Sequence, residues 1–398
     1  MRPDILSART VVFVNIAHAF DHFILLIYPT AVIAIAAQQG LDYGSLINLA
    51  TGAFVAFGLF SLPMGWIADH VGRRNMLAVF FLGYGASCAG MALAETPTAL
   101  AGGLLVVGIF SAIYHPIGSA MLVSHARQLG HDLGWNGVWG NLGAASASAV
   151  TALLAAALGW RWAFVLPGLA SLMVGIAFLA MVPGDGDITS RSGAGAKPIA
   201  TSRPILVLAV LATAIVAGGM TFNVTTIALP KVIDERMGFE LPLTIIGSLA
   251  TVVFVFGALT QLLMGRLIDR YSLPSIFVGL AALQPVGLAV AAASTGVPLL
   301  IGLFIITSAI YGQVVINDAM VARYVPAHYR AKAYSVRYFL GFTASGFAAP
   351  MIALLYARGN FPVVLGTTAV FGGAVVLCAI AFKLLSSDQT LPSTVAAE

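Results

Sequence analysis

The sequence predicts an all-α polytopic membrane protein whose twelve transmembrane helices form two pseudo-symmetric six-helix bundles. The first observation is composition: 60% of the 398 residues are hydrophobic and 9% are charged, whereas soluble globular chains carry about 25% charged residues. The second is that apolar runs near the spanning length of about 20 residues recur along the whole chain. The third is an internal repeat that relates the two halves.

Gly, Pro and polar residues divide the apolar sequence into twelve spans. The first half holds spans 10–37, 45–68, 75–94, 98–123, 134–158 and 161–182, and the second half holds spans 204–230, 243–268, 274–293, 297–322, 332–356 and 361–384. The only long polar stretch, residues 184–203, is rich in Gly, Ser, Asp and Pro and predicts a flexible cytoplasmic linker. We therefore expect an N-terminal bundle over residues 1–183 and a C-terminal bundle over residues 204–398.

The repeat relates equivalent positions in the two halves. After the second and eighth spans, Met64, Gly65 and Asp69 recur 200 residues later as Met264, Gly265 and Asp269. In the fifth and eleventh spans, Gly140 and the pair Leu153-Leu154 recur 201 residues later as Gly341 and Leu354-Leu355. Two matches at nearly one offset indicate parallel six-helix halves, and such halves place a substrate site between them near the bilayer midplane.

The basic residues indicate topology rather than nucleic-acid binding, because they are neither clustered nor interleaved with aromatic residues. With an inside N-terminus, all but five of the 19 Lys and Arg residues fall in inside segments. The exceptions are Arg161, Lys231, Arg236 and Arg358, which fall outside, and Arg337, which lies within a span. This distribution satisfies the positive-inside rule for short loops. We expect a multi-pass protein of a bacterial-type inner membrane with both termini in the cytoplasm.

Several classes of site find no support in the sequence. Cys88 and Cys378 lie in distant apolar runs without metal-type spacing, which argues against a disulfide framework or a thiol metal cluster. No ATP-binding loop, nucleophile elbow or metalloprotease motif occurs, which disfavours a primary pump and an enzyme. We expect no cofactor, and a monomer, since one chain already contains both halves of a translocation path.

Residues 65–74, Gly-Trp-Ile-Ala-Asp-His-Val-Gly-Arg-Arg, resemble the signature loop between helices 2 and 3 of the major facilitator superfamily. This resemblance covers the whole chain and implies the major facilitator fold, with transport by alternating access. It also implies that the loop latches the cytoplasmic side in the outward-facing state. Gating residues are then Gly65, Asp69, Gly72, Arg73 and Arg74, together with Asp269 of the second copy, which lacks the following Gly-Arg-Arg.

Within the superfamily, the chain resembles the fosmidomycin-resistance group of drug exporters. Three segments carry the resemblance: Ala17-His18 with Asp21-His22, residues 108–116 ending in Tyr114-His115-Pro116, and residues 140–144. The resemblance implies efflux by a proton-coupled antiporter. This sequence has Ile117 where that group has an acidic residue, and no Pro follows Gly143 in the antiporter signature.

Ionisable groups inside the spans are costly in lipid, so each is a functional candidate. Asp21 lies 11 residues into the first apolar run, roughly 16 Å deep at about 1.5 Å per residue. Asn15, His18 and His22 share one helical face, with Asp21 adjacent to His18. A buried carboxylate beside imidazoles can exchange protons near neutral pH, so Asp21 with His18 or His22 is the predicted proton-coupling site. The alternatives are a packed hydrogen-bond network joining the first and fifth spans, or direct coordination of substrate.

Other polar residues within the spans are candidates for binding a polar ligand. Pro116 frees a backbone carbonyl beside His115 and can break the helix where it lines a cavity. The predicted substrate-binding residues are Asn15, Tyr114, His115, Asn136 and Asn141 in the first half, and Asn223, Tyr311, Gln313, Asn317 and Arg337 in the second. A lone buried histidine is more often structural, so a packing role for His115 stays open.

Asp318 and Arg337 are the remaining charges within the spans. Asp318 lies near the inner end of span 297–322, where it can pair with Arg323 or Arg330 in a cytoplasmic gate. Arg337 can neutralise an anionic substrate or pair with Asp318, and we favour the pair.

Three functions follow in order of preference. The first is secondary active transport of a small organic molecule, a drug or metabolite, driven by the proton gradient, with export preferred. The second is divalent metal transport, with Asp21, His18, His22, His115 and Asn223 as ligands. The third is a non-transporting membrane sensor, although a sensor has no need of pseudo-symmetric halves.

Overall fold

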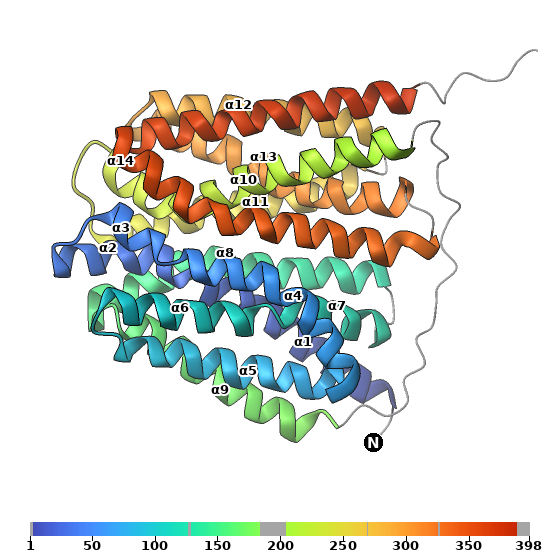
Figure 1. Ribbon diagram of the computed structural model, residues 1–398, viewed down its shortest axis with the longest axis horizontal. Helices are drawn as coiled ribbons and strands as arrows, with labels where there is room; N and C mark the ends of the chain where they lie inside the picture. Colours follow the sequence, from blue (N-terminus) through green and yellow to red (C-terminus); the bar gives the residue numbers. More distant parts are fainter. Residues whose placement is uncertain (1–2, 126–128, 184–203, 269, 325–326, 388–398) are drawn as a thin grey trace, which may run out of the picture.

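The computed structural model describes residues 3–125, 129–183, 204–268, 270–324 and 327–387, and these residues are helical throughout apart from short connections. The N-terminal half contains α1 (Pro3–Leu25), α2 (Ile27–Gln39), α3 (Tyr43–Asn48), α4 (Thr51–Val71), α5 (Arg73–Gly90), the 3₁₀ turn η1 (Met91–Leu93), α6 (Pro97–Ser111), α7 (Tyr114–His125), α8 (Leu129–Leu158) and α9 (Trp162–Met181). The C-terminal half contains α10 (Pro204–Arg236), α11 (Leu243–Leu267), α12 (Leu273–Ala293), α13 (Gly296–Tyr324) and α14 (Ala327–Ser387). The two halves lie one above the other with their helices running lengthwise (Figure 1).

The helices have the length and composition of membrane spans. Eleven segments of the described chain qualify, and the last of them, residues 339–386, is 48 residues long. This segment is two helices, because Gly359 and Asn360 leave the helical conformation and the chain reverses there. Asn360 has φ 55°, a left-handed conformation that Asn tolerates better than most residues. The predicted all-helical architecture of twelve spans is therefore confirmed.

Local sequence explains where the first helices begin and end. Asp42 accepts a hydrogen bond from Ser45 N at 2.8 Å and so caps α3. Thr96 caps α6 in the same way, and Pro97 occupies its first turn. Gly72 has φ 91° between α4 and α5, a value that only Gly adopts readily, so the signature loop turns at this residue.

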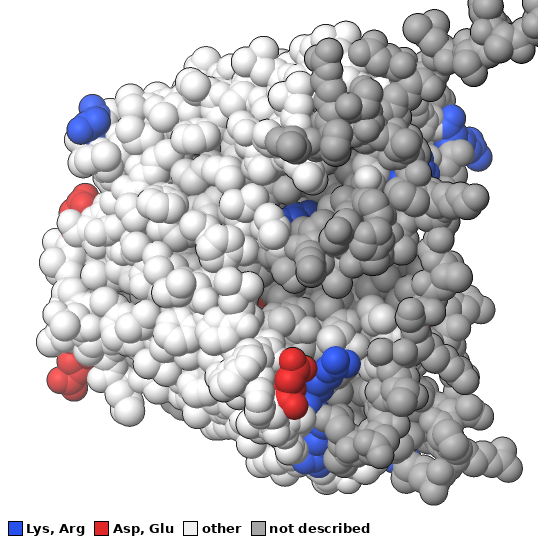
Figure 2. Space-filling view, turned by 45° about the vertical axis from the view of Figure 1, so that its right-hand side comes forward, with Lys and Arg blue, Asp and Glu red and all other residues white. Residues whose placement is uncertain are grey.

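The termini of the described chain lie at one end of the bundle. Figure 1 shows α1 beginning and α14 ending on the right, an end called here the α1 end. The opposite end carries the α2–α3 turn at residues 40–42 and is called the α3 end. On the face shown in Figure 2, the coloured Lys, Arg, Asp and Glu residues lie mostly near the two ends, with an uncharged band between them. Such a band is the surface expected of a protein that spans a bilayer.

The halves contact each other through the helices that carry the sequence repeat. Helix α4 packs against α14, and α8 packs against α11. Since α11 is the second copy of α4 and the first part of α14 is the second copy of α8, the two contacts are related by the pseudo-symmetry. Close approach requires glycine: a Cβ on Gly58 would lie 2.9 Å from the backbone of Phe342, and one on Gly247 would lie 2.5 Å from Ser148 O.

The described contacts between the halves extend from the α3 end to the middle of the bundle. Tyr43 packs on Tyr356 with ring centroids 5.2 Å apart, and Phe57 packs on Phe342 at 4.3 Å. Further along α4, Trp66 is 66% exposed and Asp69 is exposed. The halves are thus packed together at the α3 end, whereas α4 is exposed toward the α1 end.

Candidate functional site

Asp21 is the most completely buried charged residue of the described N-terminal half. Its exposure is 0%, and its Oδ1 accepts a hydrogen bond from Ser111 Oγ at 2.6 Å. Its Oδ2 lies 3.2 Å from His115 Nε2, and the Tyr84 hydroxyl donates to its backbone carbonyl at 3.0 Å. Helices α6 and α7 thus contact the carboxylate itself and α5 contacts the backbone beside it, which is the expected arrangement for a buried acid that must be paired or hydrogen-bonded.

A break between α6 and α7 positions His115 toward Asp21. The chain leaves the α-helix at Ala112 and Ile113, where Ile113 N bonds Phe110 O at 3.2 Å in a tighter turn. Pro116 has no N–H to donate to the Ala112 carbonyl, so the helix cannot continue regularly through this point. The predicted helix break at this proline is present, and it lies beside the buried acid.

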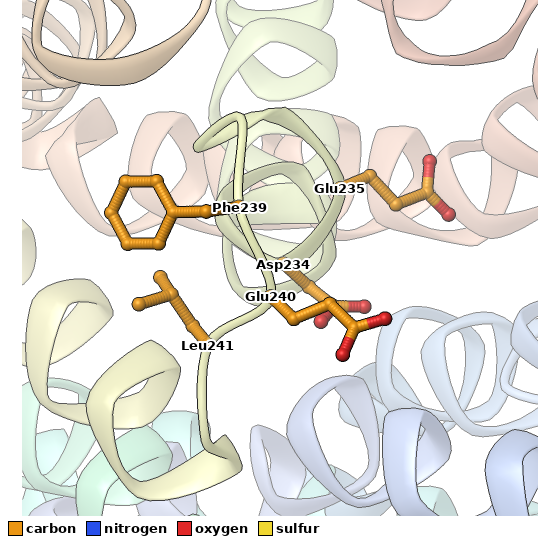
Figure 3. A pocket seen from close by; sticks show the side chains of 5 residues that line it. All are labelled: Asp234, Glu235, Phe239, Glu240 and Leu241. Carbon is orange, nitrogen blue, oxygen red and sulfur yellow. The ribbon is translucent and has the colours of Figure 1, made fainter.

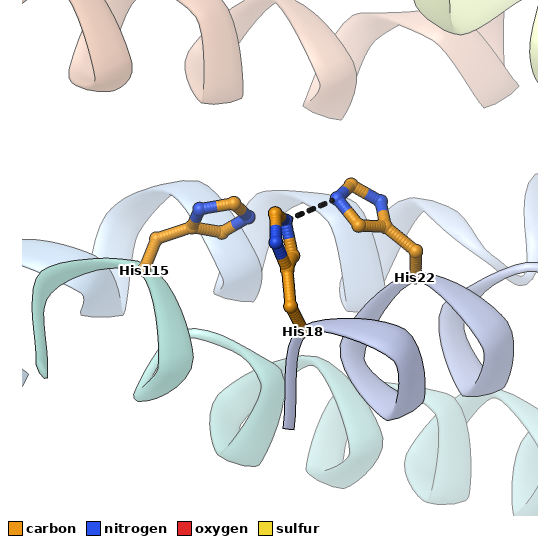
Figure 4. A group of neighbouring side chains, drawn as sticks. All are labelled: His18, His22 and His115. Atoms are coloured by element: carbon orange, nitrogen blue, oxygen red, sulfur yellow. Dashed lines mark hydrogen bonds between the residues drawn. The ribbon is translucent and has the colours of Figure 1, made fainter. Parts of the chain in front are cut away.

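Three histidines converge on one another (Figure 4), and one of them, His115, lies against Asp21. His22 Nε2 lies 3.1 Å from His18 Nε2, and His115 packs edge-on against both rings at 5.6 and 5.7 Å between centroids. One ring nitrogen of each histidine lies within 4.8 Å of those of the other two. Two of the histidines come from α1 and one from α7, so the cluster belongs entirely to the N-terminal half. It is called here the histidine cluster.

A second set of hydrogen bonds ties the histidine cluster to α8. His18 Nδ1 lies 2.8 Å from the backbone carbonyl of Asn136, and the His18 ring stacks on Tyr114 at 4.9 Å. The Asn136 side chain donates to Asn15 Oδ1 at 2.9 Å and to the Tyr114 hydroxyl at 3.0 Å. Four of the predicted first-half residues, Asn15, His18, Tyr114 and Asn136, are thus joined in one network.

Glycines in α8 make this network possible. A Cβ on Gly140 would lie 2.6 Å from His18 Nε2, and one on Gly143 would lie 2.1 Å from Ala19 O. Both distances are too short for a side chain, so α8 approaches α1 here because these residues have none. The Gly-rich segment that resembles an antiporter signature therefore holds His18 in place.

Of the predicted polar residues of the C-terminal half, Gln313 belongs to a separate buried network, and the others lie outside it. Thr221 Oγ1 donates to Gln284 Oε1 at 2.9 Å, and Gln284 Nε2 donates to Gln313. Gln284 is 0% exposed and Gln313 is 3% exposed. Tyr311 is buried against Phe222 at 5.2 Å, Asn223 donates to its own helix at Gly219 O, and Asn317 is half-buried. The described contacts do not connect these residues to the histidine cluster.

The two charges predicted within the second half are paired with each other. Arg337 donates to Asp318 Oδ1, with side-chain exposures of 10% for Arg337 and 43% for Asp318. Arg323, the alternative partner, donates to the Ile268 carbonyl at 3.2 Å instead. The structure therefore has the pair that the sequence favoured, which joins α13 to α14.

Asn141 is at the contact between the halves. Its amide donates to Gln261, on α11, and nearby Thr251 donates to the Ala145 carbonyl at 2.6 Å. In this conformation the Asn141 amide is committed to the partner half, so it acts as an interface residue. The physical reason is that α8 and α11 pack against each other, so side chains of the two helices face one another across the contact.

The signature loop lies at the α1 end. Arg74 Nε donates to Val182 O at 2.9 Å and its guanidinium to Leu179 O at 2.7 Å, so Arg74 satisfies the carbonyls at the end of α9. Gly65 would place a Cβ 3.8 Å from Pro116, which leaves ordinary space. Arg73 is half-buried and Asp69 is exposed, while Asp269 of the second copy lies outside the described residues. In this conformation the loop is bound within its own half.

A surface hollow of about 490 Å³ lies at the α3 end, and Figure 3 shows the side chains that line it. It is lined by Asp234, Glu235, Phe239, Glu240 and Leu241. Lys231 neutralises two of its acids, with Nζ 2.5 Å from Asp234 and 3.3 Å from Glu235. Tyr356 of α14 also donates to Glu235. The hollow thus belongs to the polar surface at the α3 end, where the halves are packed together, rather than to an interior binding site.

Sequence reasoning missed several residues that shape the site. Ser111 and Tyr84 are hydroxyl residues in largely apolar helices, and Phe342 contacts His115 from the other half at 5.1 Å between ring centroids. Ser111 precedes His115 by four residues, so helical spacing was a usable signal. Tyr84 and Phe342 had none, because their roles depend on packing between distant segments.

Comparisons with known proteins agree on the fold. The family model of the Major Facilitator Superfamily matches residues 11–245 and, in a second match, residues 211–397. A solved bacterial homolog to the human lysosomal transporter Spinster, inward-facing and occupied, has a TM-score of 0.77 at 14% identity, with 100% of both chains covered. A D-xylose–proton symporter has a TM-score of 0.74 at 14% identity, over 95% of this chain and 97% of its own. No curated protein matches this chain significantly.

Proposed function

Because this chain belongs to the major facilitator superfamily, we propose that it is a proton-coupled secondary active transporter of a small organic molecule, with Asp21 as the proton carrier. The observation that carries this assignment is the place of Asp21, fully buried in the first span, hydrogen-bonded to Ser111 and 3.2 Å from His115 Nε2. A carboxylate inside a bilayer is costly unless it has a function. The names of the similar structures, a transporter and a proton symporter, support secondary transport.

The proton path uses the histidine cluster. Asp21 contacts His115 directly, and His115 packs on His18 and His22, both of which are partly exposed. Protons from the open side reach the imidazoles first, because Asp21 itself has no exposure. Protonation of Asp21 removes its negative charge and weakens its hold on Ser111 and His115, on α6 and α7. A change at these helices is transmitted to Phe342 of the opposite half, which packs on His115.

Substrate binds between the halves by alternating access. Asn15, Tyr114 and Asn136 supply hydrogen bonds from the N-terminal half, and Asn317 and Arg337 supply polar groups from the C-terminal half. Closure at the α3 end with α4 exposed toward the α1 end corresponds to an inward-facing state, if the α1 end is cytoplasmic. The described basic residues at that end, which include Arg73, Arg74, Arg266 and Arg323, support this orientation.

The proposal also covers the direction of transport and the membrane in which the protein lies. The similarity to the fosmidomycin-resistance group favours export of a drug or metabolite by antiport with protons. We place the protein as a monomer in a bacterial-type inner membrane, with both termini and the 184–203 linker in the cytoplasm.

The test is transport in proteoliposomes under an imposed proton gradient, with a panel of phosphonates, organic acids, lipophilic cations and divalent metals. We expect Asp21→Asn to lower gradient-driven flux by at least about 100-fold, the lower range for loss of a proton-transfer group, while substrate exchange without a gradient persists. Asp318→Asn is the matched control, because it removes a carboxylate that is paired with a basic side chain in the C-terminal half, and its gradient-driven flux should stay within about tenfold of wild type.

Three outcomes decide the assignment. Equal gradient-driven flux in wild type and Asp21→Asn would remove Asp21 from coupling. Loss of both driven flux and exchange in Asp21→Asn would make Asp21 a substrate or structural residue. Flux of a divalent metal alone would replace the organic substrate with a metal.

A further inference from the structure

The histidine cluster has a property that proton transfer does not require. Three imidazoles each present one ring nitrogen within 4.8 Å of the others, whereas one acid and one relay histidine would suffice to move a proton. We propose that His18, His22 and His115 form a binding site for a divalent transition metal ion of the zinc class, held between α1 and α7. This site is independent of which organic molecule the protein carries.

The donor set selects the class of metal. Neutral imidazole suits Zn²⁺, Cu²⁺, Ni²⁺ and Co²⁺, whereas Ca²⁺ and Mg²⁺ require several oxygen ligands. Thiol ligands are absent from this part of the structure, since Cys88 donates to the Phe164 carbonyl elsewhere in the N-terminal half. Three histidines leave a fourth position open in a tetrahedral zinc site, and that position is available to water or to an incoming anion.

Groups around the cluster orient the imidazoles as outer-shell partners do in metal sites. His18 Nδ1–H donates to the Asn136 carbonyl, which leaves the Nε2 lone pair facing His22 Nε2 at 3.1 Å. Asp21 Oδ2 lies 3.2 Å from His115 Nε2, which gives the carboxylate–histidine pairing common around zinc. Tyr114 stacks on His18 and Gly140 leaves space for its ring, so the ring has little freedom to turn away.

The histidine cluster is accessible to a small ion and is covered on another side by aromatic rings. His18, His22 and His115 are each partly exposed, so their rings are accessible to a small ion. Phe57 and Phe342 pack on His115 at 5.7 and 5.1 Å and cover it from the side of the interface. All three ligands belong to one half, so binding does not require the two halves to move together. An ion there adds two positive charges beside Asp21, and we expect it to inhibit proton-coupled transport.

Binding is measured on purified protein whose affinity tag has been removed. Isothermal titration with Zn²⁺ should give one site per chain, and Co²⁺ should give the visible absorption of a tetrahedral site. His18→Ala, His22→Ala and His115→Ala should each weaken Zn²⁺ binding by more than about tenfold, at least the effect of losing an outer-shell partner. His70→Ala is the matched control, because His70 is exposed and bonds its own helix at Trp66 O, and it should leave binding unchanged.

The folding of each variant is checked by its size-exclusion profile and melting temperature. His22→Gln is added as a conservative variant, because it keeps a polar side chain of similar size but removes the imidazole. Absence of a Zn²⁺ site in wild type, or retention of the site in the variant lacking all three histidines, would overturn the inference.

The experiments can overturn the metal site and the proposed function independently of each other. Zn²⁺ binding with no metal flux in proteoliposomes, and inhibition of wild-type driven flux that is reversed when a chelator removes the ion, supports an inhibitory site. Zn²⁺ flux that requires the three histidines keeps the site but makes the metal the cargo, which overturns the organic substrate instead.

Discussion

The two halves of the molecule share a fold but carry chemically different side chains at equivalent positions. In the N-terminal half, Asp21 on α1 lies beside Tyr84 on α5, whose hydroxyl bonds its backbone. At the 200-residue offset of the repeat, Thr221 on α10 and Gln284 on α12 stand at these two positions, and they also bond each other. The contact between the equivalent helices is conserved by the pseudo-symmetry, but a titratable acid has become a neutral hydroxyl.

The same contrast extends to the neighbours of this contact. Around Asp21 lie three imidazoles, a hydroxyl and an amide network, whereas Thr221 and Gln284 connect to Gln313 alone among their described side-chain partners. Neutral amides donate and accept hydrogen bonds but do not change protonation state near neutral pH. Under the proposed function, this difference places proton handling in the N-terminal half and a fixed packing contact in its counterpart.

The largest effect on stability is expected from Gln284→Leu. This substitution leaves Thr221 and Gln313 without their shared partner in a fully buried site, and each such loss costs about 1–3 kcal/mol. We expect a clearly lower melting temperature in detergent, while the dependence of transport on the proton gradient is unchanged in the folded fraction. The measurements are thermal unfolding and driven flux normalised to folded protein.

Asp21→Asn is the matched variant, because it keeps the size of the side chain and its bond to Ser111. It should do the opposite, with a small change in melting temperature and loss of coupling. If Gln284→Leu abolished coupling in folded protein, the division of labour between the halves would be wrong.

Much of the fold could be predicted because lipid leaves few alternatives. A backbone in hydrocarbon must satisfy its own hydrogen bonds, so long apolar runs predict helices directly. The division at residues 359–360 was also readable, since Gly359, Asn360 and Pro362 interrupt an apolar run. The repeat of Gly65 and Gly140 identified α4, α8, α11 and α14, which are the helices where the halves meet.

The site could be predicted only where its residues are rare in membrane spans. Asp21, His18, His22 and His115 stand out because ionisable groups are costly in lipid. Gln284 did not stand out, because a single amide among apolar residues resembles many packing contacts. Asn141 was expected at a ligand, but its partner Gln261 comes from a helix 120 residues away, and no local pattern reveals such a pairing.

The second-largest effect on stability is expected at a glycine that recurs in both halves. A Cβ on Gly140 would lie 2.6 Å from His18 Nε2, whereas a Cβ on its repeat partner Gly341 meets nothing within 4 Å. We expect Gly140→Ala to cost about 1–3 kcal/mol by overpacking and to weaken Zn²⁺ binding, because His18 must move. Gly341→Ala should be neutral or stabilise its helix by up to about 1 kcal/mol. Unfolding in detergent and Zn²⁺ titration measure both variants, and equal penalties at the two positions would contradict the asymmetry.

The smallest effect distinguishes two buried tyrosines on the equivalent spans α7 and α13. Tyr114 accepts from Asn136 at 3.0 Å and stacks on His18, whereas Tyr311 packs by its ring against Phe222 and Phe254. Tyr114→Phe keeps the stack and removes the hydroxyl, so we expect a loss of about 1 kcal/mol, because Asn136 keeps its bond to Asn15.

Tyr311→Phe retains both ring contacts, and its melting temperature should be closer to that of wild type. Coupled transport should follow the same order, because only Tyr114 belongs to the network that holds His18 toward His22. A larger loss of coupling in Tyr311→Phe than in Tyr114→Phe would place the functional centre in the C-terminal half. The Tyr311 hydroxyl would then have a role in coupling, although the described contacts of Tyr311 are made by its ring.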